Sequence, residues 1–304
     1  SDDPFTLQEK NGLLYGRGTC DMKGFIASVL AKAADMQSAP LKRPFHLAFS
    51  YDEEVGCIGV GPLVDFIARE VEVKPGMCIV GEPTLMKPIN AHKGGHHVHC
   101  HITGHECHSS LAPSGVNALE YGGELISHIN TIARRIAENG PFNADFDPPY
   151  TTFNVGIFNG GTALNIVPNH AELQFSMRPI PEQNSDDIVN EIREYAFRIL
   201  EPRMKAVAPK SGFSFSEPVR IPPFSNDENA EVVQLVLNIT GENKPKKVSF
   251  ATEAGLFQAA GIPTVVCGPG SIEQAHKPDE FIALSEMKKC SRFLDALIKY
   301  AADY

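Results

Sequence analysis

The stretch PFHLAFSYDEEVG (residues 44–56) is a run of apolar and strand-forming residues that ends in three acids. Phe45–Tyr51 therefore predicts a buried strand, with Asp52–Glu54 at its carboxyl end. Met77–Val80 and Pro263–Cys267 are apolar runs of the same kind, and each is also followed by turn or polar residues. Three such runs predict strands of one sheet.

Helical patterns lie between these runs. Apolar residues recur at three- and four-residue spacing over Met22–Ala33, and more briefly over Leu63–Arg69. Strands that alternate with helices indicate an α/β unit, with a mainly parallel sheet and helices on both faces.

The middle of the chain has a different pattern. Its segments predict the order β-α-β-β-α-β, that of a ferredoxin-like sandwich. We therefore expect an inserted lid and dimerisation domain over residues 96–216, and a catalytic domain formed by residues 1–95 and 217–304. The predicted elements are His97–Thr103, Asn117–Ile136, Thr152–Phe158, Ala171–Met177, Ser185–Leu200 and Gly212–Ser216.

Composition excludes several classes of protein. With 304 residues, 42% hydrophobic and 21% charged, the chain is globular rather than disordered. The net charge of −10, with no basic stripe, argues against nucleic acid or an anionic membrane as a partner. No apolar run approaches the roughly 20 residues of a membrane span, and the start is not a signal peptide. Seven cysteines without CxxC spacing indicate free thiols, so we expect a cytoplasmic protein.

Acidic and histidine side chains follow the predicted strands or precede the first strong helix. They are Asp21, Glu53, Glu54, Glu82 and His276. In an open α/β sheet the carboxyl ends of the strands form one ligand-binding edge, so these residues are expected to converge. Crowded carboxylates repel one another unless a cation lies between them, and oxygen ligands with imidazole suit Zn²⁺, with Co²⁺ or Mn²⁺ as alternatives.

A bridging carboxylate would hold two metals roughly 3.5–4 Å apart, a pair that activates water and polarises a carbonyl. Only one of Glu53 and Glu54 need bind metal, and the other is free to transfer a proton. Each residue alone also has a plain structural explanation: Asp21 as a helix cap, Glu82 as a turn residue, the Glu pair as solvated charges and His276 as a loop residue. Spacing alone does not decide between these explanations.

The amino-acid sequences of these segments resemble motifs of the M20 family of metallo-aminoacylases and peptidases. GRGTCDMKG (16–24), DEEVG (52–56), GEPT (81–84) and QAHKPDE (274–280) resemble its metal and catalytic motifs. In the inserted part, HSS (108–110) and the segments around Gly160–Asn165 and Arg178 resemble its lid. The match runs in order along nearly the whole chain.

The resemblance implies a role for each matching residue of the catalytic domain. Asp21 would bridge two zinc ions, Glu82 would bind one of them, and Glu54 and His276 the other. Glu53 would be the general base.

The lid residues also take roles from this resemblance. His108 resembles a histidine that, in dimeric members, reaches into the partner's active site to stabilise the oxyanion. Asn165 and Arg178 resemble residues that hold the substrate, with Arg178 suited to an α-carboxylate. Gly268 is grouped with these substrate-binding residues. The alternatives are a structural ion pair for Arg178 and plain loop polarity for His108.

Within the family, the stretches Thr252–Ala254 and Cys267–Ile272 are most similar to the acetylornithine deacetylase branch. This similarity implies a homodimer that hydrolyses a small N-acyl amino acid, N-acetyl-L-ornithine, in arginine biosynthesis. Succinyl-diaminopimelate or acetylcitrulline is the rival substrate. Two other classes remain: a non-catalytic binding protein of the same fold, and a metal-dependent phosphatase, for which phosphate-binding donors are lacking.

One family motif has no counterpart here. The family carries an H-x-D well upstream of the GRG segment, and its histidine is a metal ligand. Residues 1–15 precede that segment and contain no histidine. We therefore expect this chain by itself to lack one metal ligand, to bind at most one metal well and to be a poor catalyst.

Overall fold

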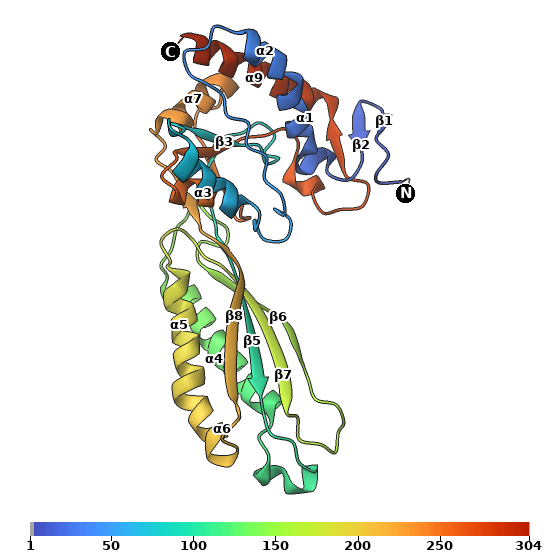
Figure 1. The fold of residues 1–304 in the computed structure, drawn as a ribbon, viewed down its shortest axis with the longest axis vertical. Coiled ribbons are helices and arrows are strands. Elements are labelled where there is room, and N and C mark those ends of the chain that lie inside the picture. The colour runs from blue at the N-terminus through green and yellow to red at the C-terminus, as the bar shows by residue number, and fades with distance from the viewer. Residues whose placement is uncertain (1–2, 304) are drawn as a thin grey trace. The chain divides into compact units, whose positions relative to one another are not determined.

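The computed structural model describes residues 3–303 and divides the chain into two compact units (Figure 1). Unit 1 comprises the residues up to His92, Phe224–Val248 and the residues from Thr252 onward. Unit 2 comprises Lys93–Pro223 and Ser249–Ala251. The second unit is inserted into the sequence of the first and runs from Lys93 to Pro223, whereas the expected inserted domain covers residues 96–216.

Unit 1 is built on a mixed sheet with the strand order β10-β4-β11-β3, in which β9 also pairs with β4. β10 is parallel to β4 and β11 to β3, whereas β11 and β9 are antiparallel to β4. The predicted α/β class is confirmed, with both kinds of pairing in the sheet. The strands are β3 (Cys78–Val80), β4 (Ile89–His92), β9 (Phe224–Ser225), β10 (Lys246–Val248) and β11 (Thr264–Val266).

Helices cover this sheet through a hydrophobic core. α7 and α8 contact β11, α3 contacts α8, and α1 contacts α9. Val236, Val265 and Phe293 are at most 3% exposed in this core, and burying each such side chain contributes roughly 1.5–3 kcal/mol. The helices are α1 (Gly24–Ala31), α2 (Ala33–Ser38), α3 (Val60–Glu70), α7 (Glu231–Thr240), α8 (Ala254–Ala259) and α9 (Leu284–Asp303), with the short turns η1 (Thr19–Lys23) and η4 (Ile272–Gln274).

A small antiparallel sheet joins the two ends of unit 1. β2 (Leu13–Tyr15) pairs with β1 (Gln8–Lys10) on one side and with β12 (Phe281–Ala283) on the other. β2 leads directly into the motif at residues 16–24, and β12 follows the motif at residues 274–280. The pairing therefore places these two motifs side by side.

The stretch Phe45–Tyr51 is not a strand, so its prediction as a buried strand is wrong. Within residues 3–303 no strand pairs with it, and Leu47 and Phe49 are 39% and 49% exposed. An apolar alternating pattern becomes a strand only where a neighbouring backbone pairs with its N–H and C=O groups, and the pattern itself does not reveal that neighbour. A side-chain contact fixes its end, since the Ser50 hydroxyl donates to Glu253 at 2.9 Å.

Unit 2 is a four-stranded antiparallel sheet, in the order β6-β7-β5-β8, packed against helices (Figure 1). Its chain order confirms the predicted ferredoxin-like arrangement. Leu125, Ile129 and Ile132 recur at helical spacing on α4 and are at most 1% exposed, so this face of α4 packs into the core. The elements are β5 (Gly95–Thr103), η2 (Ser109–Ser114), α4 (Ala118–Asn139), β6 (Thr152–Gly160), β7 (His170–Arg178), α5 (Ser185–Tyr195), η3 (Ala196–Leu200), α6 (Glu201–Val207) and β8 (Gly212–Ile221).

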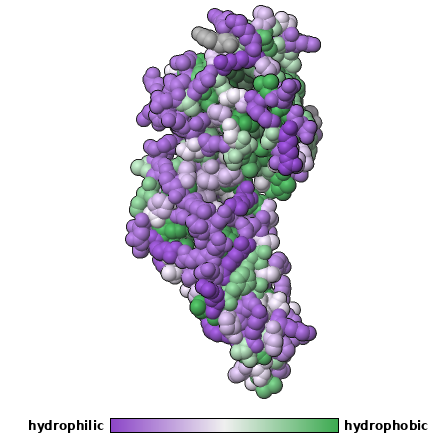
Figure 2. Space-filling view, turned by 60° about the vertical axis from the view of Figure 1, so that its left-hand side comes forward, coloured by the Kyte–Doolittle hydropathy of each residue, from purple (hydrophilic) through white to green (hydrophobic). Residues whose placement is uncertain are grey.

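The surface is largely hydrophilic on the face drawn in Figure 2, with hydrophobic residues in smaller patches between. Among residues 3–303, no helix is both long enough and apolar enough to cross a bilayer. The helices instead bury one apolar face each, as in α4 and α9.

Candidate metal centre

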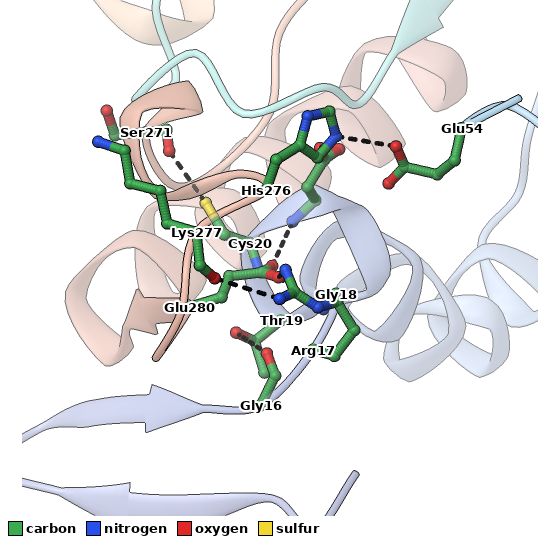
Figure 3. Close-up of polar contacts among 11 residues, drawn as sticks. Gly16, Arg17, Gly18, Thr19, Cys20, Glu54, Ser271, His276, Lys277 and Glu280 are labelled. Atoms are coloured by element: carbon green, nitrogen blue, oxygen red, sulfur yellow. Dashed lines mark hydrogen bonds and ion pairs between the residues drawn. The ribbon is translucent and has the colours of Figure 1, made fainter. Parts of the chain in front are cut away.

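Three potential metal ligands from distant parts of the sequence meet in unit 1. Atoms of Asp21, Glu54 and His276 that are able to ligate a metal lie within 4.8 Å of one another. His276 Nε2 lies 2.8 Å from Glu54 Oε2 and 3.4 Å from Asp21 Oδ2, and Figure 3 shows its ring directed at Glu54. Asp21 forms the inner side of the group, with 12% of its side chain exposed, whereas His276 is 71% exposed. The imidazole nitrogen thus lies within 4 Å of both acids.

Glu82, which follows β3, contacts the same Asp21 from a buried position. It is only 5% exposed, and burial together with the Asp21 charge raises the pKa of Glu82 well above its usual range. Burial also raises the pKa of Asp21, and each of the two carboxyl groups lies close enough to change the pKa of the other. Asp21 is therefore the residue that both Glu82 and His276 contact.

The loop that carries Asp21 is held by Glu280, four residues after His276. Its carboxylate accepts hydrogen bonds from the backbone N–H groups of Gly18 (2.9 Å), Cys20 (2.9 Å) and Asp21 (3.0 Å). The Arg17 guanidinium donates to the same carboxylate at 2.9 Å (Figure 3). Gly18 has a φ of 81°, a backbone conformation that suits glycine. Glu280 thus connects the segments of two metal-ligand candidates, a role that motif spacing does not reveal.

Glu53 lies beside the group and has the properties of a base. Burial is the main reason that its pKa rises to about 7, and the charges of Glu54 and Asp21 add to the rise. The Cys57 thiol donates to Glu53 Oε1 at 3.4 Å. Asp52, just before it, and His276 both have φ values near +55°, namely 54° and 58°. Non-glycine residues in this region are strained, and such strain is concentrated at functional sites.

Gly268 lies where two chain segments touch. A Cβ atom at this position would lie 2.1 Å from the carbonyl oxygen of Gly81, so only glycine fits. Its N–H group and its carbonyl both bond to Thr84. Close packing therefore explains why glycine occupies position 268. Its contact with substrate stays a prediction.

The remaining predicted residues belong to unit 2. His108 is exposed and caps η2: its Nδ1 accepts from Ser110 N at 3.2 Å. Ser109 N donates to Asn165 O at 2.9 Å, so the His108 and Asn165 loops are neighbours. Arg178 is exposed at the end of β7, and its charge contributes to a lowered pKa of His97, which burial chiefly causes. Their action on a substrate stays a prediction.

The donor atoms fit a metal of the expected kind. Carboxylate oxygens and one imidazole nitrogen suit Zn²⁺, Co²⁺ and Mn²⁺. A second group, His96, Asp186 and Glu217 in unit 2, also meets the distance criterion. There the acids are paired with Arg220 and Arg193, so positive charge is already supplied. The first group is the metal centre that the geometry favours.

Comparison with known proteins supports this interpretation. The chain is 38% identical over 302 residues to acetylornithine deacetylase of Proteus mirabilis, covering 98% of this chain and 74% of that protein. The Edwardsiella ictaluri enzyme of the same name is 35% identical, with 98% and 75% covered. Aminopeptidase PepT from Bacillus cereus has a similar fold, with a TM-score of 0.70, 21% identity and 98% and 76% covered. So does a Sulfolobus solfataricus M20 family metallo-carboxypeptidase, with a TM-score of 0.69, 19% identity and 99% and 80% covered.

The family assignment rests on the length of the match. The sequence model of the family described as peptidase family M20/M25/M40 matches residues 1–300, which include every residue of the metal centre. The chain therefore belongs to peptidase family M20/M25/M40 and is a metal-dependent amide hydrolase.

Proposed function

We propose that the protein hydrolyses N-acetyl-L-ornithine to ornithine and acetate, as a cytoplasmic step of arginine biosynthesis. The main support is the 38% identity to an enzyme named for that substrate, over 98% of this chain. The metal centre supports the amide-hydrolase chemistry, because its acids and imidazole form one group beside a base of raised pKa.

Asp21, Glu54, Glu82 and His276 would hold Zn²⁺, and with the ligands present in this chain we expect one ion to bind well. When bound, zinc supplies a Lewis acid that polarises the amide carbonyl and lowers the pKa of water. A bound cation would favour the charged form of Glu82 and so oppose the burial that raises the pKa of this carboxyl.

Glu53 would act as the general base. A carboxylate with a pKa of about 7 is deprotonated in half of the molecules at neutral pH and still basic enough to accept a proton from the attacking water. The same carboxyl would then donate that proton to the leaving nitrogen of ornithine. Its Cys57 contact holds one oxygen and leaves the other for the water.

Residues of the inserted unit would bind the substrate in a homodimer. His108 accepts a hydrogen bond at Nδ1, which leaves Nε2–H as the donor of the neutral ring. Such a donor, supplied by the partner subunit, would stabilise the oxyanion that forms on the acetyl carbonyl. Arg178 would bind the α-carboxylate, with Asn165 and Gly268 beside the substrate.

The test is release of the free amino acid by the purified, zinc-loaded protein from each member of a panel of acyl amino acids. N-acetyl-L-ornithine should give a higher kcat/KM than N-succinyl-diaminopimelate and N-acetyl-L-citrulline. A higher value for either of the others would transfer the assignment to that substrate. Binding without turnover of any of them would instead identify a binding protein of this fold.

A further inference from the structure

Glu253 is a buried carboxylate, and one of its oxygens has no hydrogen-bond partner within the described residues. It lies at the start of α8 and is only 8% exposed. Oε2 accepts a hydrogen bond from the Ser50 hydroxyl at 2.9 Å. Oε1 is buried and has no hydrogen-bond partner within the described residues. A buried carboxylate oxygen without a donor is costly, so such an atom indicates a missing ligand.

This carboxylate lies beside the reaction centre without belonging to the metal-ligand group. Its charge contributes to the raised pKa values of both Glu53 and Glu82. The group of atoms within 4.8 Å of one another contains Asp21, Glu54 and His276 and does not include Glu253. Glu253, which carries the unpaired Oε1, is therefore close enough to change the pKa values of Glu53 and Glu82 electrostatically. It is not one of the candidate metal ligands.

A positively charged N–H donor fits this position best. The acids Glu53 and Glu82 feel the charge of Glu253, so its surroundings disfavour an anion, and a cation would offset the burial that raises the pKa of Glu253. Resting on the proposed function, we propose that Glu253 binds the terminal ammonium of the substrate's side chain. The site would thereby select N-acyl amino acids with a cationic side chain over those with an apolar or acidic one.

The selection follows from desolvation. A substrate with an ammonium group compensates Oε1, whereas a substrate of equal length without it buries that oxygen against methyl groups. N-acetyl-L-norvaline is the matched probe, since it has the propyl chain of ornithine without the amine. The zinc-loaded protein should prefer N-acetyl-L-ornithine to N-acetyl-L-norvaline by at least tenfold in kcat/KM.

Glu253→Gln should abolish this preference. Its kcat/KM for N-acetyl-L-ornithine should fall roughly ten- to a hundredfold, mainly through KM, while that for N-acetyl-L-norvaline is unchanged or rises. Glu201→Gln is the matched control, because Glu201 also has a buried oxygen without a partner but lies in unit 2 and is paired with Lys205. Glu253→Asp keeps the charge and should retain part of the preference.

Other outcomes overturn the inference. A wild-type protein that treats both substrates alike refutes it without any variant, even where Glu253→Gln fails to fold. An equal fall for both substrates in Glu253→Gln would make Glu253 a structural or catalytic residue instead.

Failure of the proposed function has a different signature. If the zinc-loaded protein hydrolyses neither substrate, calorimetric binding of L-ornithine and L-norvaline decides the point. Tighter binding of ornithine that disappears in Glu253→Gln upholds the cation subsite, and equal binding of both amino acids refutes it.

Discussion

Replacing Glu280 by glutamine should release the loop that carries Asp21. One carboxylate oxygen accepts from the N–H groups of Cys20 and Asp21, and the other from Gly18 and Arg17. Whichever way the glutamine amide turns, its NH₂ group faces two donors and loses both bonds. At about 1.5–3 kcal/mol for each hydrogen bond to a charged group, the loop loses about 3–6 kcal/mol.

That loss should appear as weaker metal binding, because the ligand loop must first be ordered. Since about 1.4 kcal/mol is tenfold in affinity, the lower figure corresponds to a roughly hundredfold rise in the Zn²⁺ dissociation constant. Titration calorimetry with Zn²⁺, together with Tm of the metal-free protein, measures both effects.

Arg17→Met is the graded control for this change. Arg17 is 44% exposed, so its ion pair with Glu280 contributes at most about 1 kcal/mol, and the backbone N–H bonds to Glu280 remain. Zn²⁺ affinity in Arg17→Met should fall less than about tenfold. Wild-type Zn²⁺ affinity in Glu280→Gln would refute the reasoning, since the loop would then be ordered without this carboxylate.

Three further predictions concern the acids and the inserted unit. Glu53→Gln should lower kcat by about 10²–10⁴ while Zn²⁺ affinity in calorimetry is retained, and near-normal turnover would remove Glu53 as the base. Because burial raises the pKa values of Glu53 (to about 7), Glu82 and Glu253, the folded metal-free protein binds protons that the unfolded chain has released. Its Tm should therefore fall as the pH rises from about 4.5 through about 7, and Zn²⁺ should remove that fall; a Tm that rises with pH in EDTA contradicts the argument. His108→Ala should lower kcat by about 10²–10³. If His108 acts across a dimer, mixing this variant with Glu53→Gln should restore part of the activity. No recovery on mixing would mean that His108 does not act across the dimer.

Polar residues at the ends of apolar runs predicted the neighbourhood of the metal centre. Asp21, Glu54 and His276 lie together in the structure, and the charge of Asp21 contributes to the raised pKa of Glu82. For Glu82 the reason is that Met77–Val80 contains a strand whose end lies at the sheet edge, whereas Glu54 joins the group although the run before it is not a strand. Their role as metal ligands stays a prediction until metal binding is measured.

Long-range contacts could not be predicted in this way. The apolar run Phe45–Tyr51 has the composition of a strand, but strand formation depends on a neighbouring backbone that the local sequence does not specify. Glu280 and Glu253 are ordinary acids in the sequence. Their importance comes from partners about 260 and 203 residues away, at Cys20 and Ser50. Pairings at such separation carry no local signal.

The pairing of β2 with β12 has a consequence for how the protein matures. Tyr15 lies opposite Phe281, and the Asp21 loop is completed only by Glu280. The Asp21 loop can therefore acquire its final shape only after residue 280 has been synthesised and has left the ribosome. A nascent chain arrested before residue 280 should therefore lack the ordered Asp21 loop and bind metal more weakly than a released chain.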